Sequence, residues 1–337
     1  MNLTKRRPSL RLIAIGAIGA LLFSAAYAAA PKGPDVEIPF EAKALKASGL
    51  TAPAYVDADG GNMVVSDRAG GVYSVTFGGA VKELASKAKV KYPAGVAVAP
   101  AGFGSYASQK FVLTASDKAG PCEVDRIDAS GAVSTFAKLP DANATGCRDL
   151  AFGPAGKYAG KLYAVTNDNA AIYAIDASGK AALFGQYEKP MGFELTTVAF
   201  APATDSKAPG LMLIGARPTI GGAAKIGRIS VINPDGKMQD NPYLVGFTRA
   251  SGFAFSPSEF GSYGDTLFIA DAGKTGDENV SNRDGQIYRV YKDVSRPFGS
   301  GLVDPTAMRF IGKKMVICDP DEKAAPNHGA IVVVTSL

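Results

Sequence analysis

The chain has 337 residues, of which 36 are Lys or Arg and 31 are Asp or Glu, so its formal net charge is +5. Four of the positive charges, on Lys5, Arg6, Arg7 and Arg11, lie at the N-terminus and leave +1 for the remainder. Because this nearly neutral remainder contains no basic run or basic helix, the composition excludes a nucleic-acid-binding protein and an electrostatic membrane binder.

The N-terminal segment is typical of an export signal. An apolar stretch over residues 12–23 follows the basic residues, and Ala26 and Ala28 supply small residues at the positions that a signal peptidase reads. The stretch is too short to span a bilayer comfortably. We therefore expect residues 1–28 to be a signal peptide, whose removal leaves no integral membrane segment.

The export route follows from the same segment. Arg6 and Arg7 half-resemble a twin-arginine signal, but Ser9 stands where an apolar residue is usual. We expect the general secretory route and a periplasmic or secreted protein.

Residues 29–337 are expected to form a single all-β domain. Short apolar runs alternate with Gly, Asp, Asn and Pro, which predicts strands and turns, and no stretch has the periodicity of an amphipathic helix. A short element, Gly-x-(Ile/Val)-x-x-(Val/Ile), recurs six times with variations. Its third positions are Val72, Val124, Ile172, Ile229, Ile287 and Ile331. The intervals of 52, 48, 57, 58 and 44 residues match the period of a β-propeller blade with variable loops.

Each repeat is predicted to contain four strands. The recurring element is the third strand, an apolar segment such as residues 95–100 precedes it as the innermost strand, and a weaker outer strand such as residues 81–84 follows it. The second strand ends in Asp in five repeats, and Arg217 stands at that place in the fourth. We expect this Asp to accept backbone N–H groups of the turn rather than to bind metal.

The last repeat predicts how the ring closes. It ends at Leu337 directly after its third strand, whereas residues 36–43 have the pattern of an outer strand without a blade of their own. Pairing of residues 36–43 with residues 329–334 would complete the last blade and leave only protected sheet edges. A disordered tail over residues 36–49 is the alternative. We predict a six-bladed β-propeller closed by its N-terminal strand.

The repeat framework resembles the propeller superfamily that contains NHL-repeat, SMP-30/gluconolactonase and strictosidine-synthase-like proteins. This resemblance implies the six-bladed fold over residues 36–337. In the family, lactonases hold one divalent cation on the axis through Glu, Asn and Asp side chains. Here Ala52 and Pro53 stand where the resemblance would require the first Glu, which argues against the lactonase site.

Polar residues at the starts of the predicted inner strands are the candidates for a ligand-binding face. They are Arg148, Asp149, Glu194, Thr196, Thr197, Ser251 and Thr306. Asp149 and Glu194 offer oxygens that a hard cation prefers, with Asp304 one step further out. The simpler interpretation is that Arg148 pairs with Asp149.

A polar loop of the fifth repeat is a second candidate metal site. Its oxygen-bearing residues could supply several of the ligands that Ca²⁺ requires, although a loop of this kind is more often only solvated. The residues are Asp277, Glu278, Asn279, Asn282 and Asp284.

Cysteine and histidine usage limits the chemistry. The single histidine, His328, lies in a turn sequence and excludes multi-histidine metal sites, while a Ser-His-Asp triad lacks its other signatures. Cys122 and Cys147 are expected at neighbouring blades on the same face, so we predict a disulfide between them and a buried free thiol at Cys318.

Two functional hypotheses remain. The preferred one is a monomeric, exported, non-catalytic propeller that binds a small-molecule ligand or a periplasmic protein on its loop face. The alternative is a lactonase-like or esterase-like hydrolase that depends on a divalent metal such as Ca²⁺ at Asp149 and Glu194. An ion bound on the axis would distinguish the two.

Overall fold

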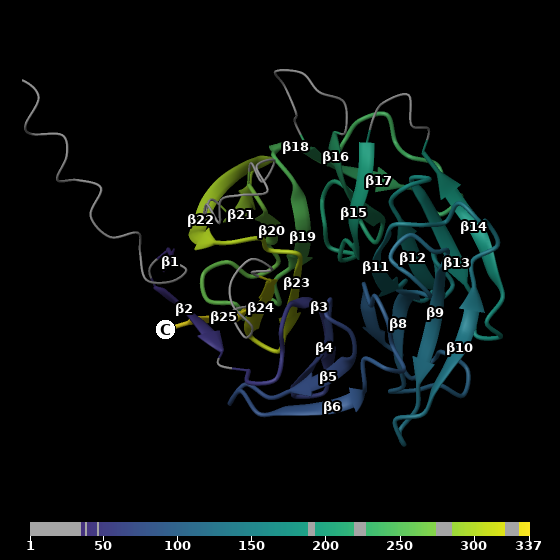
Figure 1. The fold of residues 1–337 in the computed structure, drawn as a ribbon. Coiled ribbons are helices and arrows are strands. Elements are labelled where there is room, and N and C mark those ends of the chain that lie inside the picture. Colours follow the sequence, from purple (N-terminus) through teal and green to yellow (C-terminus); the bar gives the residue numbers. More distant parts are fainter. Residues whose placement is uncertain are drawn as a thin grey trace, which may run out of the picture. The chain divides into compact units, whose positions relative to one another are not determined.

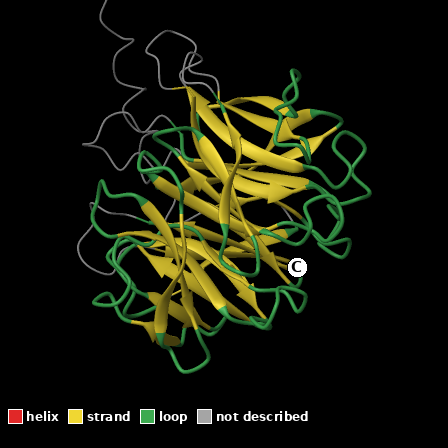
Figure 2. Ribbon diagram, turned by 90° about the vertical axis from the view of Figure 1, so that its right-hand side faces the viewer, coloured by secondary structure: helices red, strands yellow, loops and turns green. Residues whose placement is uncertain are grey.

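The computed structural model describes residues 35–37, 39–45, 47–187, 193–218, 227–273, 285–320 and 330–337. These residues form strands, turns and loops (Figure 2), and no helix among them is long and apolar enough to cross a membrane. The predicted signal peptide lies outside the described residues.

The strands form six sheets, one for each blade. Blade one consists of β3 (Pro53–Asp59), β4 (Asn62–Asp67), β5 (Val72–Val75) and β6 (Val81–Ala85). Blade two consists of β7 (Val96–Val98), β8 (Lys110–Ala115), β9 (Cys122–Ile127) and β10 (Val133–Lys138). Blade three consists of β11 (Cys147–Phe152), β12 (Leu162–Thr166), β13 (Ala171–Ile175) and β14 (Ala181–Gln186). Blade four consists of β15 (Phe193–Phe200), β16 (Met212–Pro218), β17 (Gly227–Ile232) and β18 (Leu244–Phe247).

The last two blades include strands from the N-terminal segment. Blade five consists of β19 (Ala250–Phe255), β20 (Leu267–Asp271), β21 (Gly285–Tyr291) and β22 (Val294–Leu302), with β1 (Asp35–Val36) at its outer edge. Blade six consists of β23 (Ala307–Ile311), β24 (Lys314–Asp319), β25 (Ala330–Ser336) and β2 (Phe40–Leu45).

The blades form a closed ring around an axis (Figure 1). Their first strands, β3, β7, β11, β15, β19 and β23, are innermost, and each contacts the next all the way round, including β23 with β3. The structure is therefore the predicted six-bladed propeller, with inner strands whose starts meet near the axis.

Ring closure is confirmed, with a different register from the one expected. The strand that completes blade six is β2, which pairs antiparallel with β25 from Phe40 opposite Ser336 to Leu45 opposite Ile331. Residues 35–36 pair with β22 of blade five instead. Pro39, which has no N–H to donate, stands between the two pairings, where the chain turns from one blade to the next. The N-terminal segment thus joins two blades.

Aromatic side chains pack the blades against one another. In blade five, the ring of Phe268 makes edge-to-face contacts with Phe260 and Phe298. Phe310 of blade six packs in the same way on Phe260, and Phe40 of β2 packs on Phe298. Equivalent clusters join blades two and three and blades three and four. This packing is why apolar residues recur in the turns of the repeat.

The Asp at the end of the second strand accepts backbone N–H groups, as predicted, in blades one, two, five and six, whereas Asp168 of blade three accepts from the Thr145 hydroxyl. Asp67 accepts backbone N–H groups from Thr51, Ala52 and Ala69, at 2.6, 3.0 and 2.8 Å. Asp271 does the same for its own blade. Each carboxylate therefore fixes the chain where it enters the inner strand and positions the residues that face the axis.

Candidate functional site

The starts of the inner strands surround a pocket with an empty volume of about 370 Å³, part of which is open to solvent. Its lining contains arginine, hydroxyl and phenol side chains from blades one, three, four, five and six. The lining residues are Tyr55, Arg68, Arg148, Thr196, Arg217, Arg249, Ser251 and Thr306.

β-Bulges shape this end of the inner strands. The pairing of inner and second strands shifts in register between Pro53 and Tyr55, Cys147 and Leu150, Leu195 and Thr197, and Ala250 and Gly252. A bulge inserts an extra residue and re-aims the side chains beside it. Arg148, Thr196 and Ser251 lie within these bulges and line the pocket.

Hydrogen bonds link each blade to the next at this level and form what we call the inter-blade belt. The donors and acceptors, in ring order, are Ser66 Oγ to Ala94 O, Gly95 N to Arg148 O, Thr197 Oγ1 to Asp149 Oδ2, Thr196 Oγ1 to Ala250 O, Ser251 Oγ to Pro305 O and Thr306 Oγ1 to Ala54 O. The belt fixes the width of the ring at the pocket. Thr196, Ser251 and Thr306 therefore have a structural role as donors as well as facing the pocket.

Two carboxylates accompany the pocket arginines. Glu194 accepts from both Nε and Nη2 of Arg217, and Asp304 accepts from Nη2 of Arg249. A more distant pair joins Asp304 Oδ2 to Arg68 Nη1 at 3.8 Å. These carboxylates are consequently engaged with guanidinium groups.

Arg148 differs from the other arginines of the pocket. Its side chain makes no hydrogen bond or ion pair with any residue in the described ranges.

The arginines also affect one another. Burial lowers the pKa of the Arg249 guanidinium, Asp304 opposes this effect, and repulsion from the other three pocket arginines lowers the pKa further. The pocket is thus electropositive, which favours anions.

Asp149 has a different environment from the one expected. Arg309, and not Arg148, pairs with it, through Nη2 at 3.3 Å from both carboxylate oxygens, so the predicted pairing of Arg148 with Asp149 is wrong. Asp149 also accepts from the Thr197 hydroxyl at 2.6 Å and from the backbone N–H of Val198 at 3.1 Å.

The Asp149–Arg309 pair spans the axial channel. Asp149 belongs to blade three and Arg309 to blade six, which is three blades away and therefore opposite in the ring. Burial opposes the charge of Arg309, but the nearby carboxylates of Asp149 and Asp57 raise the pKa of its guanidinium above the usual value. The Asp149 side chain is only 1% exposed. Its role is therefore structural, and a ligand in the pocket does not reach it.

The axial residues do not fit a divalent cation. The carboxylates of Asp149, Glu194 and Asp304 all bind guanidinium groups, and the described residues contain no group of three His, Cys, Asp or Glu side chains suited to a metal. Four arginines would also repel a cation at the mouth of the ring. The second candidate, the loop Asp277–Asp284, lies outside the described residues, as does His328.

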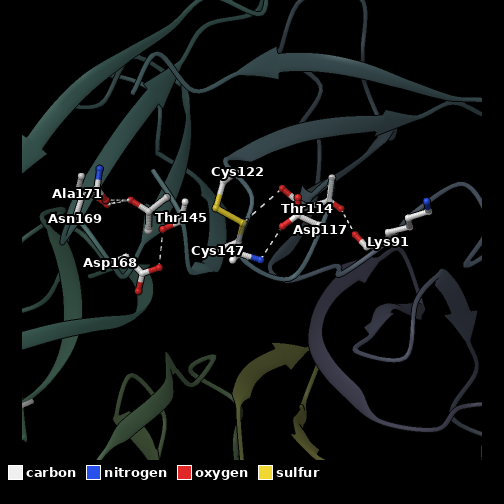
Figure 3. The surroundings of a disulfide bond; sticks show 11 residues. Lys91, Thr114, Asp117, Cys122, Thr145, Cys147, Asp168, Asn169 and Ala171 are labelled. Carbon is white, nitrogen blue, oxygen red and sulfur yellow. Dashed lines mark hydrogen bonds between the residues drawn. A yellow bond between two sulfur atoms is a disulfide. The ribbon is translucent and has the colours of Figure 1, made fainter. Parts of the chain in front are cut away.

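A disulfide stands next to the pocket. Cys122 at the start of β9 and Cys147 at the start of β11 are bonded, as predicted, and their Cα atoms are 5.7 Å apart (Figure 3). Cys318 is a buried free cysteine, also as predicted. Because Cys147 directly precedes Arg148, the disulfide fixes the part of β11 that presents this arginine to the pocket.

The structure brings together four of the seven candidates for the ligand face: Arg148, Thr196, Ser251 and Thr306 line the pocket. Glu194 is the partner of Arg217, and Asp149 and Thr197 are bonded to each other and buried.

Sequence reasoning missed four lining residues, Tyr55, Arg68, Arg217 and Arg249. One signal was present, since Arg217 replaces the Asp of the other repeats. The position of Arg249 was a second signal, because it directly precedes the inner strand that contains the candidate Ser251.

Comparison with known proteins supports the fold. No protein-family model matches the sequence, and no curated protein does either. The protein is similar in structure to a gluconolactonase from Xanthomonas campestris, with a TM-score of 0.62, 11% identity, and coverage of 90% of this chain and 94% of that one.

Two further solved structures show the same likeness. A virginiamycin B lyase from Staphylococcus aureus has a TM-score of 0.55, 13% identity, and coverage of 88% and 100%. The soluble aldose sugar dehydrogenase from Escherichia coli has a TM-score of 0.58, 14% identity, and the same coverage. At these identities the shared property is the six-bladed propeller fold, which hosts different activities.

Proposed function

We propose that this protein is an exported, non-catalytic propeller that binds a small organic anion in its axial pocket. The observation that carries the proposal is the set of four guanidinium groups around one pocket, among which Arg148 has no partner in the described parts of the chain. Guanidinium groups present a planar fork of donors that matches carboxylate and phosphate oxygens. The site is a pocket lined by side chains of five blades rather than a flat face, which favours a small ligand over a protein partner.

The alternative function, metal-dependent hydrolysis, has weaker support. Fold similarity to a gluconolactonase agrees with it, but the two carboxylates that it requires on the axis are occupied by Arg309 and Arg217. A hydrolase of this kind would need ligands from outside the described residues. An assay of lactone hydrolysis with and without Ca²⁺ therefore accompanies the binding experiment, and we expect no activity above the uncatalysed rate.

The binding experiment measures the melting temperature at low ionic strength, where screening is weak. Glycerate and inorganic phosphate are the anionic probes, and glycerol is the uncharged control. A ligand that binds only the folded state raises the melting temperature by mass action. We expect both anions to raise it and glycerol to leave it unchanged.

Two variants locate the effect. Arg148→Gln removes a pocket charge that stabilises no described partner, and Arg296→Gln removes a charge from the exposed part of β22. The anion-dependent shift should disappear in Arg148→Gln and persist in Arg296→Gln. An equal shift in Arg148→Gln and the parent protein would place anion binding elsewhere and refute the proposal.

Export and monomeric state belong to the same proposal. The Cys122–Cys147 disulfide agrees with an oxidising compartment, where such bonds persist. The intact mass of exported protein should correspond to a chain that starts at Ala29 or within a residue or two of it. Size-exclusion chromatography with light scattering should give the mass of one chain.

A further inference from the structure

The pocket hydroxyls have a restricted hydrogen-bonding capacity. Thr196, Ser251 and Thr306 each direct their single hydroxyl proton to a backbone carbonyl, and the acceptors are Ala250 O, Pro305 O and Ala54 O of the next blade. A hydroxyl has one donor and two lone pairs. The other close partners of Ser251 and Thr306, the carbonyls of Ala270 and Cys318, are also acceptors. Toward a ligand, these three oxygens therefore offer lone pairs only.

The arginines have the opposite capacity, since a guanidinium group only donates. They reach the pocket from blades one, three, four and five, and hence from several sides of the ring. A carboxylate is planar and has two oxygens, which suits one or two guanidinium forks. A phosphoryl group has three terminal oxygens in a tetrahedral arrangement and nearly two negative charges at neutral pH. It can accept hydrogen bonds from guanidinium groups that approach from different directions.

We infer that the ligand is a phosphorylated polyol, in which a phosphoryl group binds the arginines and hydroxyl groups donate to Thr196, Ser251 and Thr306. This inference rests on the proposed function, because it requires that the pocket binds anions. It adds two requirements: the anionic group is tetrahedral, and the body that carries it has hydrogen-bond donors. A ligand without such donors would leave the three pocket oxygens facing apolar atoms, which is unfavourable.

Calorimetric titration with three probes separates these requirements. sn-Glycerol 3-phosphate has both features, propyl phosphate lacks the hydroxyls, and glycerate replaces the phosphoryl group with a carboxylate. We expect glycerol 3-phosphate to bind about tenfold or more tightly than either of the others, because each of them loses hydrogen bonds and a tenfold change in affinity corresponds to about 1.4 kcal/mol. Arg148→Gln should weaken its binding at least about tenfold, and Arg296→Gln should leave it unchanged.

Each contrary outcome identifies the step that fails. Equal affinities for propyl phosphate and glycerol 3-phosphate would refute the role of the pocket hydroxyls. Glycerate binding as tightly as glycerol 3-phosphate would refute the phosphoryl group and leave the proposed anion site standing. If no probe binds, or if Arg148→Gln binds glycerol 3-phosphate as the parent does, both the inference and the proposed function are wrong.

Discussion

At the scale of single residues, the pocket depends on how neighbouring charges are paired. Arg148 and Asp149 are adjacent in the chain but have opposite roles. The arginine lines the pocket without a described partner, and the carboxylate is buried in the belt against Arg309. A bulge between Cys147 and Leu150 makes this division possible, because it changes the alternation of side chains along β11.

The Asp149–Arg309 pair yields a prediction about stability. Asp149→Ala leaves the Arg309 guanidinium without its main counter-charge, so we expect the free energy of unfolding to fall by about 3–5 kcal/mol. Replacing both partners, as in Asp149→Leu with Arg309→Met, should recover much of this loss. Urea denaturation of the parent, the single variant and the double variant measures the loss of stability and its recovery. A calcium titration of chelator-treated Asp149→Ala should match that of the parent, and calcium binding lost in the variant would contradict the structural role of Asp149.

Asp125 predicts a dependence of stability on pH. This residue of β9 is 7% exposed, and burial, reinforced by Glu123, raises the pKa of its carboxyl to about 6. Because the folded-state pKa lies above the unfolded value, the folded state loses stability as pH rises from about 4 to 6, by up to about 3 kcal/mol. Asp125→Asn does not titrate, so it should be more stable than the parent at pH 7 and similar to it at pH 4. Parallel stability curves for the two proteins would contradict this interpretation.

At the scale of elements, close contacts between blades restrict which residues can occupy the turns between strands. Gly179 lies in the turn between β13 and β14 with φ of +83°, and a Cβ built there would be 2.4 Å from the carbonyl oxygen of Phe136 in blade two. Gly236 has the same relation to Phe184 of blade three. The glycine of this turn is therefore needed both for its backbone angle and for the close approach of the preceding blade.

Gly179→Ala tests this contact. We expect it to lower the free energy of unfolding by about 2–4 kcal/mol, since the left-handed backbone strain and the overlap with Phe136 both contribute. Gly60→Ala is the matched control, because Gly60 also has a positive φ, of +59°, but a Cβ at this position would meet no other atom within 4 Å. Denaturant midpoints should fall further for Gly179→Ala than for Gly60→Ala, and equal losses would show that strain alone matters.

The disulfide between β9 and β11 gives a second prediction at this scale. Peptide mapping without reduction should recover Cys122 linked to Cys147 and an unmodified Cys318, whose burial raises the pKa of its thiol. Removing the bond by Cys122→Ser with Cys147→Ser should reduce stability by about 2–4 kcal/mol. Recovery of Cys318 in a disulfide-linked peptide would contradict the fold described for blade six.

At the scale of the whole molecule, the N-terminal segment holds the ring closed. β2 supplies the outer strand of blade six, and Glu37 accepts hydrogen bonds from Arg289 Nε at 3.0 Å and from the Tyr263 hydroxyl at 2.8 Å in blade five. Phe40 packs on the aromatic cluster of blade five. One short segment therefore stabilises the junction between two blades.

Deletion of residues 29–46 should open this junction. The loss of the Phe40 side chain from its cluster alone corresponds to about 3–5 kcal/mol, and the exposed edge of β25 adds to it. Deletion of residues 29–34, which precede β1, is the control. Thermal denaturation should show a much lower melting temperature for the longer deletion only, and an unchanged value would refute closure by the N-terminal segment.

The sequence by itself determined the architecture of this protein, because a blade is a local unit whose strand and turn pattern repeats along the chain. The six repeats, the closing strand and the Cys122–Cys147 bond all follow from such patterns together with the order of blades in a ring. The starts of the inner strands likewise predicted four residues that line the pocket, namely Arg148, Thr196, Ser251 and Thr306.

Only the tertiary structure decided which charges meet at the axis. Residues such as Arg68, Arg217, Arg249 and Thr306 are far apart in sequence, and the ring brings them to one pocket. Bulges then set which neighbour faces the pocket, and Arg309 reaches Asp149 from the opposite blade. The sequence repeat does not predict these pairings, because they depend on distances across the ring rather than along the chain.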